Sequence, residues 1–503
     1  TSGAHATVGG GDTNTASGTQ STVGGGFSNT ASGTQSTVGG GGGNTASGLR
    51  SFVGGGDTNT ASNTYATVGG GDTNTASGNR ATVSGGDTNT ASDEYATVGG
   101  GNNNNASGQR SFVGGGQTNT ASGSFSAIGG GQNNTASDIY STVSGGASNT
   151  ASSDNATVGG GGNNTASSDY STVSGGQNND ATTNTHATVG GGTNNTASGQ
   201  GSTVAGGQSN TASTLAGTVG GGQNNVASGT QFTTVAGGRN NTSSGSRATI
   251  GGGQSNTSSN NYSTVSGGFT NNASANRSTI SGGESNTATD THTTVGGGFG
   301  NDATNDYSTI SGGQNNTASG LRSFVGGGLG NTASSTLSVV AGGESNTAGG
   351  TLSTASGYQA GTSRWGQFAH SSGRFSSNGD AQFSRYILRT ATTDATANVE
   401  LFLDGTGGSN RITIPEETTF SFHIYITSIQ QSGNNAKSSE IVGLIRRQNG
   451  GNATIVGQHT DGNKTFNDGG FNPSYTISAD TTNQALKIDV TGIAATNIHT
   501  VAT

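Results

Sequence analysis

The chain contains few side chains that could catalyse a reaction, and paired carboxylates are the first candidates. Glu416 and Glu417 are adjacent, and Asp461 and Asp468 are the other clustered pair. Paired carboxylates are the groups that hydrolyse glycosidic bonds, but we interpret these four as turn and surface residues. The sequence contains no nucleophile elbow, zinc-ligand spacing, phosphate-binding loop or catalytic triad pattern. We therefore expect no enzymatic activity, no bound metal and no cofactor.

A second cluster lies near the C-terminus and is basic. Arg446 and Arg447 are adjacent, and His459 follows twelve positions after Arg447. These side chains could face an acidic glycan at the tip of the molecule. A strand that points one arginine inward and the other outward explains the Arg446–Arg447 pair as well. We keep both interpretations.

A third set of side chains recurs through the first 355 residues, each three positions before a branched apolar residue. This spacing places them outward on the strand that carries the apolar residue. Tyr, Arg and His suit sugars and acidic polymers, so one hypothesis is a glycan- or receptor-binding track. The other is packing between chains, because Arg over Tyr is a favourable pair and both are enriched at interfaces. The members are Arg50, Tyr65, Arg80, Tyr95, Arg110, Tyr140, Tyr170, Arg247, Tyr262, Arg277, Tyr307 and Arg322.

A fifteen-residue repeat positions these side chains. The unit reads S-T-V-G-G-G-x-x-N-T-A-S-x-x-x, and its branched apolar residue recurs from Val8, Val23 and Val38 to Val340, with two single-residue insertions, in 23 units. A fixed period of this kind predicts a solenoid in which each unit is one coil. At ~4.7–4.8 Å per coil, these coils would make a rod roughly 110 Å long.

Two columns of small or apolar residues predict the interior of the coils. Val and the Ser or Ala two positions before it share one face of a strand, and Ala recurs eight positions after the branched apolar residue, as at Ala16 and Ala31, with only Ser243 and Ser258 departing from it. Each coil therefore has two short strands, one anchored by Val and one by Ala. Glycines stand two and three positions after each Val, and we expect both to be required by positive φ and close packing at a corner.

Asparagine stands six positions after the branched apolar residue in all 23 units. An Asn at a turn bonds to its own backbone and tolerates a left-handed conformation, and stacked amides can bond to one another. We interpret the column as a structural ladder at a corner, with a ligand ladder as the alternative. Its first members are Asn14, Asn29, Asn44, Asn59 and Asn74.

The composition excludes several classes of protein. Charged residues make up 9% and hydrophobic residues 26% of the chain, both well below the usual share in globular domains. The net charge is −9 without a basic stripe, so we expect no nucleic-acid binding. No apolar run approaches the ~18 residues of a membrane helix, so we expect no membrane insertion. Cysteine is absent, which excludes disulfides and thiolate metal sites.

The repeat register dissolves after Val340. Tyr358, Trp365 and Phe368 fall in this segment, and aromatic residues at such a boundary predict a neck or cap over the open end of the roll. From residue 385 the composition becomes ordinary, and alternating segments predict an antiparallel β-sandwich of jelly-roll-like type without a helix. The predicted strands are Arg385–Arg389, Val399–Leu403, Arg411–Ile414, Thr418–Ile429, Glu440–Arg447, Ala453–His459, Ser474–Ser478, Ala485–Val490 and Ile498–Ala502.

Two parts of the chain resemble known families. The alternation of T-A-S-G with S-T-V-G-G-G resembles the head repeats of trimeric autotransporter adhesins, although the unit here is one residue longer. This resemblance implies a parallel β-roll in a three-chain assembly. The stretches G-R-F-S-S-N-G-D-A-Q-F-S-R-Y-I-L-R, E-L-F-L-D-G, R-I-T-I-P, G-L-I-R-R and T-G-I-A-A-T-N-I-H-T-V-A resemble a C-terminal domain of phage tail-fibre-like proteins. That resemblance implies a trimeric, virion-attached fibre.

Together these observations predict an all-β chain: a β-roll shaft over 1–355, a neck over 356–384 and a C-terminal β-sandwich over 385–503. A coil that encloses only Val, Ala and Ser buries little apolar area, which favours a homotrimer independently. We expect a phage tail fibre, located on the virion, that binds the host surface. Its partners would be its own copies, other tail or baseplate proteins and a host glycan or protein. A cellular trimeric adhesin or extracellular filament subunit is the alternative, with a fibre-borne depolymerase or an ice-binding protein less favoured.

Overall fold

The computed structural model describes residues 1–433, 435–460, 466–468 and 470–503. The chain divides into two compact units, Thr1–Asn271 and Asn272–Thr503. All the regular secondary structure in the described residues is β. The predicted all-β class, a parallel β-solenoid followed by antiparallel sheets, is confirmed.

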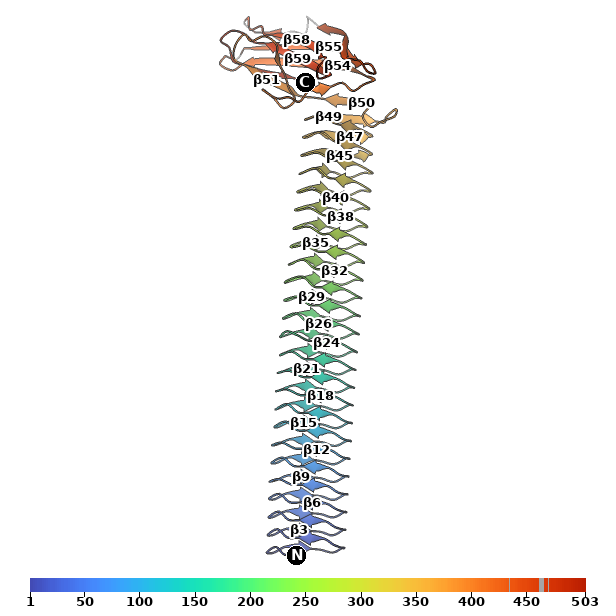
Figure 1. The fold of residues 1–503 in the computed structure, drawn as a ribbon, viewed down its shortest axis with the longest axis vertical. Coiled ribbons are helices and arrows are strands. Elements are labelled where there is room, and N and C mark those ends of the chain that lie inside the picture. The colour runs from blue at the N-terminus through green and yellow to red at the C-terminus, as the bar shows by residue number, and fades with distance from the viewer. Residues whose placement is uncertain (434, 461–465, 469) are drawn as a thin grey trace. The chain divides into compact units, whose positions relative to one another are not determined.

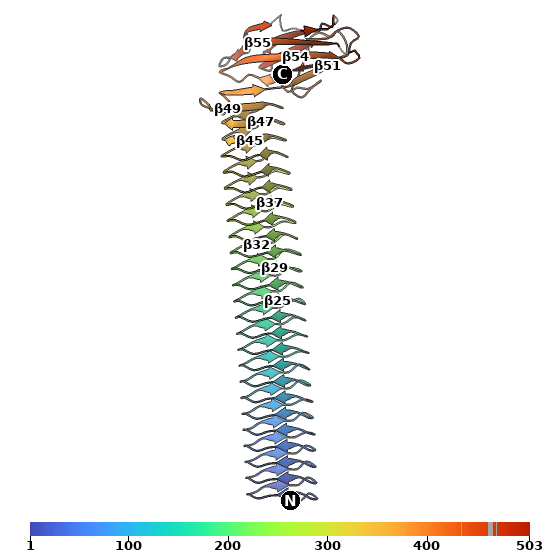
Figure 2. The same ribbon diagram turned by 180° about the vertical axis from the view of Figure 1, so that it is seen from behind.

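The first unit is a parallel β-solenoid, with one coil stacked on the next (Figure 1, and from behind Figure 2). Each strand pairs in parallel with the equivalent strand of the next coil, so that Val8 lies opposite Val23 and Ala16 opposite Ala31. The Val strands carry odd numbers and the Ala strands even numbers. They run from β1 (Thr7–Val8), β2 (Thr15–Ala16), β3 (Thr22–Val23) and β4 (Thr30–Ala31) to β34 (Thr257–Ser258) and β35 (Thr264–Val265).

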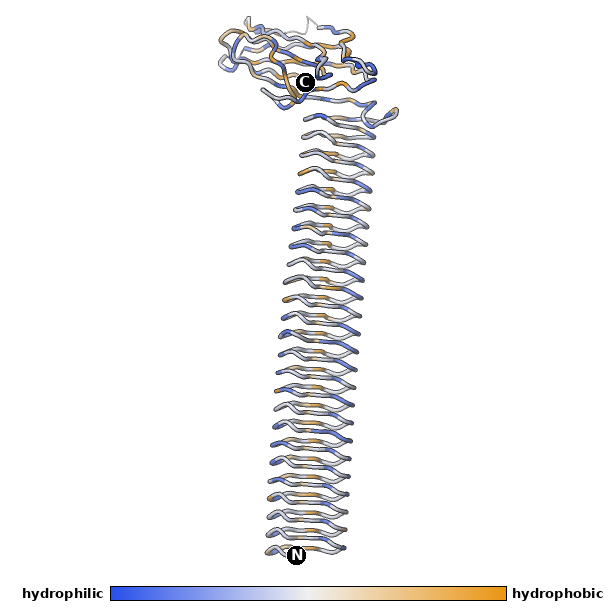
Figure 3. The backbone as a smooth tube through the Cα atoms, viewed as in Figure 1, coloured by the Kyte–Doolittle hydropathy of each residue, from blue (hydrophilic) through white to orange (hydrophobic). Residues whose placement is uncertain are grey.

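The interior of each coil consists of the two columns that the sequence singles out. Val23, Val38, Ala16 and Ala31 have no exposed surface. Figure 3 shows the hydrophobic segments recurring at one place in successive coils, between hydrophilic corners. Because these side chains are small, the opposite walls of the coil approach closely and leave space for little else.

Only one of the two corner glycines is sterically required. In the coil of Ile128, Gly131 has φ of 93°, and a Cβ on it would lie 2.1 Å from the carbonyl oxygen of Gly146 in the next coil. A Cβ on the neighbouring Gly130 would meet nothing within 4 Å. The prediction that both glycines need close packing is therefore wrong for the first of them, which faces open space.

Both single-residue insertions fall in the same turn of the coil. Before the first, Thr165 pairs with Asp180 in β24 (Asp180–Ala181), and after it Asp180 pairs with Thr196. The second likewise follows β30 (Val226–Ala227). This turn, between the Ala strand and the next Val strand, points away from the interior, so an extra residue there leaves both strand columns in register.

The second unit begins with further coils whose strands lengthen toward the C-terminal sheets. Parallel pairing continues beyond residue 355, with Ala355 opposite Ala369. The antiparallel strand β50 then reverses the chain direction against β49. These coils comprise β36 (Asn272–Ala273) to β44 (Thr332–Ala333), followed by β45 (Val339–Glu344), β46 (Thr347–Ala348), β47 (Thr354–Tyr358), β48 (Gly361–Thr362), β49 (Phe368–Ser372) and β50 (Gln382–Arg385).

The C-terminal part of this unit consists of two antiparallel sheets. One has the order β51-β60-β54-β55-β56 with β57 beside β55, and the other has β52-β59-β53 with β58 beside β59. Leu401, Ile426, Ile445, Ile488 and Val490 belong to one buried cluster that draws on both sheets. The strands are β51 (Leu388–Thr392), β52 (Val399–Glu400), β53 (Ile412–Thr413), β54 (Thr418–Gln430), β55 (Ala436–Arg447), β56 (Ala453–Thr460), β57 (Phe466–Asn467), β58 (Ser474–Asp480), β59 (Ala485–Thr491) and β60 (Ile498–Ala502).

Most of the strands expected from alternation are present with shifted ends. The segment expected at Arg385–Arg389 is instead the end of β50 and the start of β51, and β55 begins at Ala436 rather than Glu440. Short β57 carries no alternation that the sequence could show. Its pairing with β55 depends on a contact between distant segments.

Candidate functional site

The asparagine column lies inside the coils and bonds every coil to its neighbours. Asn74 has no exposed surface. Its Nδ2 donates to the carbonyl oxygens of Gly70 in its own coil at 2.9 Å and of Gly86 in the next coil at 2.8 Å. Its Oδ1 accepts the backbone N–H of Asn89 at 3.0 Å. Both amide protons and the oxygen are therefore used, which leaves no group of this side chain to bind a ligand.

The same three bonds recur at the other asparagines that the sequence analysis placed in this column. Asn29, Asn44 and Asn59 are fully buried, while Asn14 begins the ladder with its two Nδ2 bonds and accepts the N–H of Asn29. In the second unit the ladder ends at Asn346, whose Oδ1 accepts the N–H of Ala360 instead. The column is a structural ladder throughout the described coils.

The side chains three positions before each branched apolar residue, which we call the variable column, occupy a turn and not a strand, and this corrects the sequence prediction. Arg50, Tyr65, Arg80 and Tyr95 have φ between 57° and 58° and immediately precede the residue that leads into the Val strand. The sequence could not show this because the strands are only two residues long. A left-handed conformation costs a residue other than glycine about 1–2 kcal/mol, so most coils hold a bulky side chain at a position that disfavours it.

Along the first unit these side chains stack on one another from coil to coil. The Arg80 guanidinium lies over the ring of Tyr65 at 5.4 Å and over that of Tyr95 at 5.2 Å. Arg110 continues the stack over Tyr95 at 5.5 Å and over Phe125 at 5.3 Å. The rings of Tyr65 and Tyr95 remain 39% and 38% exposed. The result is a continuous, half-exposed column of alternating cations and aromatic rings.

The remaining members of the column form shorter stacks. Phe125 stacks on Tyr140, Tyr170 stacks on His186, and Arg247 lies over Phe232 and Tyr262. In the second unit His292 stacks on Tyr307, and Arg322 lies over Tyr307 at 5.5 Å. Arg277 occupies the same left-handed turn position.

The predicted neck residues do not act together. Tyr358 and Phe368 are 41% and 43% exposed, whereas Trp365 packs against the buried cluster of the C-terminal sheets. Arg364, which the sequence analysis missed, lies over the rings of Tyr386 and Phe420. The contact between the last coils and the C-terminal sheets therefore rests on Arg364 and Trp365.

The predicted tip residues lie on two neighbouring strands, β55 and β56, and do not all share one face of the sheet. Arg446 lies between Thr419 and Thr454 in the sheet and is exposed. His459 lies opposite Val442 on the same outward face, because Val442 and Arg446 are four residues apart. Arg447 points to the other face, where its Nη2 makes an ion pair with Glu416 at 2.9 Å. The outward face thus keeps Arg446 and His459 and loses Arg447.

Of the clustered carboxylates predicted as turn and surface residues, Glu416 and Glu417 lie in a turn. Glu416 pairs with Arg447, and Glu417 is exposed with φ of 57°. Asp461 lies outside the described residues, and Asp468 is exposed. No group of three or more His, Asp or Glu residues in the described ranges could hold a metal ion. Among the same residues, no helix is long and apolar enough to cross a bilayer.

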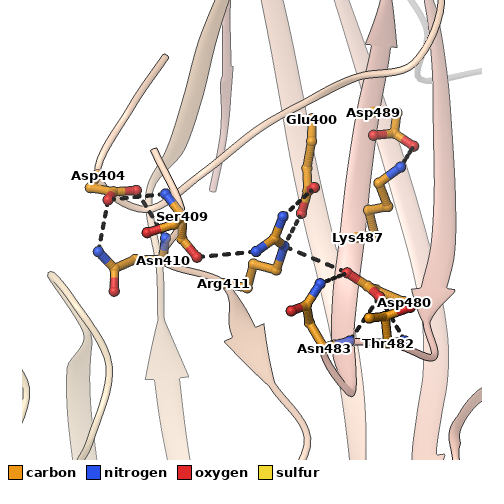
Figure 4. A network of polar contacts seen from close by, with 10 residues as sticks. All are labelled: Glu400, Asp404, Ser409, Asn410, Arg411, Asp480, Thr482, Asn483, Lys487 and Asp489. Atoms are coloured by element: carbon orange, nitrogen blue, oxygen red, sulfur yellow. Dashed lines mark hydrogen bonds and ion pairs between the residues drawn. The ribbon is translucent and has the colours of Figure 1, made fainter. Parts of the chain in front are cut away.

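A polar network on the smaller sheet engages the other carboxylates (Figure 4). Glu400 binds Arg411 through two bonds of 2.8 and 3.0 Å and thereby raises the pKa of that guanidinium. Partial burial opposes ionisation of Asp480, but hydrogen bonds from Asn483 and Thr482 and the charge of Arg411 lower its pKa. The lowered pKa of Asp480 is the opposite of the raised pKa that a general acid requires.

Comparison with known proteins adds little to this geometry. No family model matches the chain, and no curated protein matches it. Among solved structures it is similar to the tailspike protein of Acinetobacter phage vB_ApiP_P1, at 8% identity and a TM-score of 0.18, over 90% of this chain and 81% of that chain. The function must therefore be argued from the chain's own residues.

Proposed function

We propose that the chain is the subunit of a structural fibre, a homotrimeric phage tail fibre that projects from the virion and binds the host surface. The asparagine ladder is the observation that carries the structural role. Each asparagine joins its own coil to both neighbours: the side chain of Asn74 bonds to Gly86 and Asn89 in the next coil, and its backbone N–H donates to Asn59 Oδ1 in the preceding coil. A column that is buried and fully bonded resists bending and shear, because any displacement of one coil breaks several short hydrogen bonds at once.

Exposed aromatic side chains in the second unit support self-association. Phe375, Phe383 and Phe466 are 91%, 66% and 71% exposed. Exposed apolar residues mark contacts with other chains where they gather into a patch, and we propose that these rings contribute to such contacts. A closed three-fold assembly would cover equivalent surfaces on every copy without leading to open aggregation.

The outward face of β54, β55 and β56 is the surface we propose for host contact. Tyr425 and Val442 are 51% and 38% exposed on it, and Arg446 and His459 share it. An aromatic ring, an arginine and a histidine can bind a glycan or a protein through many weak contacts, and three copies would multiply these contacts.

Native mass spectrometry of the purified chain tests the assembly. Three times the chain mass of 48.7 kDa is the expected result. A monomer would overturn the trimer, and a polydisperse series of masses would instead support an extracellular filament subunit.

Adsorption of the labelled full chain to bacterial cells tests the host contact. The double substitution Arg446→Ala with Tyr425→Ala should reduce adsorption while leaving the native mass unchanged. Asp12→Asn, far from this sheet in sequence and exposed, is the control. Undiminished adsorption by the double variant would assign host contact to another surface.

A further inference from the structure

Besides its corner glycine, each coil contains two positions with positive φ, and their occupants differ. One lies five positions after the Val and is occupied mainly by Asn, Ser and Thr, such as Asn103 with φ of 55° and Thr73 with φ of 56°. Asn adopts this conformation readily, whereas β-branched Thr does not. The other is the variable column, where Tyr95 and Arg110 have φ of 58°. Bulky residues at positive φ are conformational outliers. Asn and Gly would suit the site, but they occupy it only at Asn155 and Gly201.

The positive charge of the coils gathers in this column. Residues 1–384 contain nine arginines, of which six stand in the column and three, Arg239, Arg364 and Arg374, stand elsewhere. The sequence shows no basic stripe, because Arg50, Arg80 and Arg110 are thirty residues apart. Stacking of the coils brings them into one line, in a chain whose net charge is −9.

The arginines of this line have no acidic partner. Among the described residues, no carboxylate lies within ion-pair distance of Arg50, Arg80 or Arg110. Their polar contacts are to neutral groups: Arg50 Nε donates to Gln35 Oε1 at 2.7 Å, and Arg80 Nη1 donates to the Tyr95 hydroxyl. The positive charge of these guanidiniums is therefore left uncompensated at a half-exposed surface.

We infer that the column from Arg50 to Phe125 binds a linear polysaccharide with one carboxylate in every disaccharide. The spacing argues for this class of ligand. Successive guanidiniums are two coils apart, or about 9.5 Å, which is close to one disaccharide of an extended β-linked chain. An aromatic ring lies between each pair, stacked by a guanidinium on either face, and its exposed edge can contact the neutral sugar. The inference does not depend on the fibre being carried by a virion.

The acidic residues that follow the column define one end of the site. Asp138, Asp154 and Asp169 recur beside the column in coils that have no arginine there, and desolvation together with the Asp138 charge raises the pKa of Asp154. A polyanion would be repelled from these three successive coils. Asp93 and Glu94 also stand beside the column, next to Tyr95, but there Arg80 and Arg110 flank them in the coils before and after. We therefore place the site over the three arginines Arg50, Arg80 and Arg110.

Binding of hyaluronan oligosaccharides to the full-length chain tests the inference. Hyaluronan alternates a carboxylate sugar with a neutral one, and its carboxyl-reduced form is the matched neutral probe. The triple substitution Arg50→Gln, Arg80→Gln and Arg110→Gln removes the charges but should fold, because Gln20 and Gln35 occupy the same column with φ of 59° and 60°. Arg239→Gln removes an exposed arginine outside the column and is the control.

We expect the wild-type chain to bind hyaluronan, with affinity rising from the disaccharide to the hexasaccharide as all three arginines are reached. The triple variant and the carboxyl-reduced probe should each weaken binding roughly tenfold or more, and Arg239→Gln should not. No binding by the wild type, or an equal loss in Arg239→Gln, would overturn the inference. So would equal affinity for duplex DNA, which would show a general polyanion surface. A changed native mass of the triple variant would assign the column to contact between chains and overturn it as well.

Discussion

The side-chain oxygen of Asn74 accepts the backbone N–H of Asn89 at 3.0 Å, and both residues are completely buried. This bond joins equivalent positions of adjacent coils, and its repetition makes the stack continuous through the first unit. Each coil therefore depends on contacts with its neighbours for stability, as in other one-dimensional repeat proteins.

Substitution of one ladder asparagine should open the stack locally. Asn134→Ala removes bonds to Gly130 and Gly146 at 2.9 Å each and to the N–H of Asn149 at 3.0 Å. Leaving the Gly130 carbonyl and the Asn149 N–H without partners should cost about 2–5 kcal/mol, while the Gly146 carbonyl keeps its bond from the Gln132 N–H. Amide hydrogen exchange should become faster in the three adjacent coils. Gln177→Ala, at an exposed position, should leave exchange unchanged, and an unaltered pattern in the ladder variant would remove the ladder as the source of rigidity.

The adjacent corner glycines should respond oppositely to the same substitution. Gly131→Ala would drive a Cβ into the Gly146 carbonyl oxygen at 2.1 Å from a left-handed backbone, whereas Gly130→Ala adds a methyl group to open space. We expect a loss of at least about 2–3 kcal/mol in the first variant and under about 1 kcal/mol in the second. Urea unfolding followed by circular dichroism measures both. Equal losses would show that the corner is set by flexibility and not by contact with the next coil.

Two serines of the inner column offer another matched pair. Ser36 Oγ is buried without a hydrogen-bond partner, while Ser51 Oγ donates to the Gly48 carbonyl oxygen at 2.8 Å. Ser36→Ala should stabilise the chain by up to about 1 kcal/mol, and Ser51→Ala should destabilise it by about 0.5–1.5 kcal/mol. Ala66 already occupies this column with no exposed surface. Changes of the same sign in urea unfolding of both variants would contradict the assignment.

The loop over residues 373–381 should be acid-resistant down to an unusually low pH. Backbone N–H groups of Ser377, Ser376 and Phe375 bond to the Asp380 carboxylate and lower its pKa to about 2, from 3.8. Because the folded-state pKa is depressed, the contribution of the charge is complete above about pH 4 and is lost as the pH falls toward 2. Amide protection in the loop should follow this titration.

Substitution of Asp380 tests whether its carboxylate holds the 373–381 loop. Asp380→Asn removes the charge at every pH and should abolish protection of the Ser376 and Ser377 amides without altering the coils. Protection that persists in Asp380→Asn, or that is lost already near pH 4 in the wild type, would contradict the role of this carboxylate.

The sequence was sufficient for the solenoid because its coils are local and identical. Val23, Ala31 and Asn29 each belong to a column with a fixed spacing, and stacking in register places equivalent residues together without any distant contact. The same locality allowed most strands of the C-terminal part to be predicted from alternation. Spacing alone could not show that the variable column sits in a left-handed turn, because a two-residue strand leaves no period to follow.

Contacts between distant segments decided the rest. Arg446 and Arg447 are equivalent in the sequence, and only their pairing with β54 and β56 turns one outward and brings the other to Glu416. Arg364 and Trp365 both contact the C-terminal sheets. The sequence singled out Trp365 as a boundary aromatic residue, but nothing in it distinguished Arg364. The sequence by itself determined the repeating coil and its interior columns, since these follow from steric size and backbone hydrogen bonding within one unit. The tertiary structure alone decided which charges and rings share a surface, because that depends on how coils and strands stack.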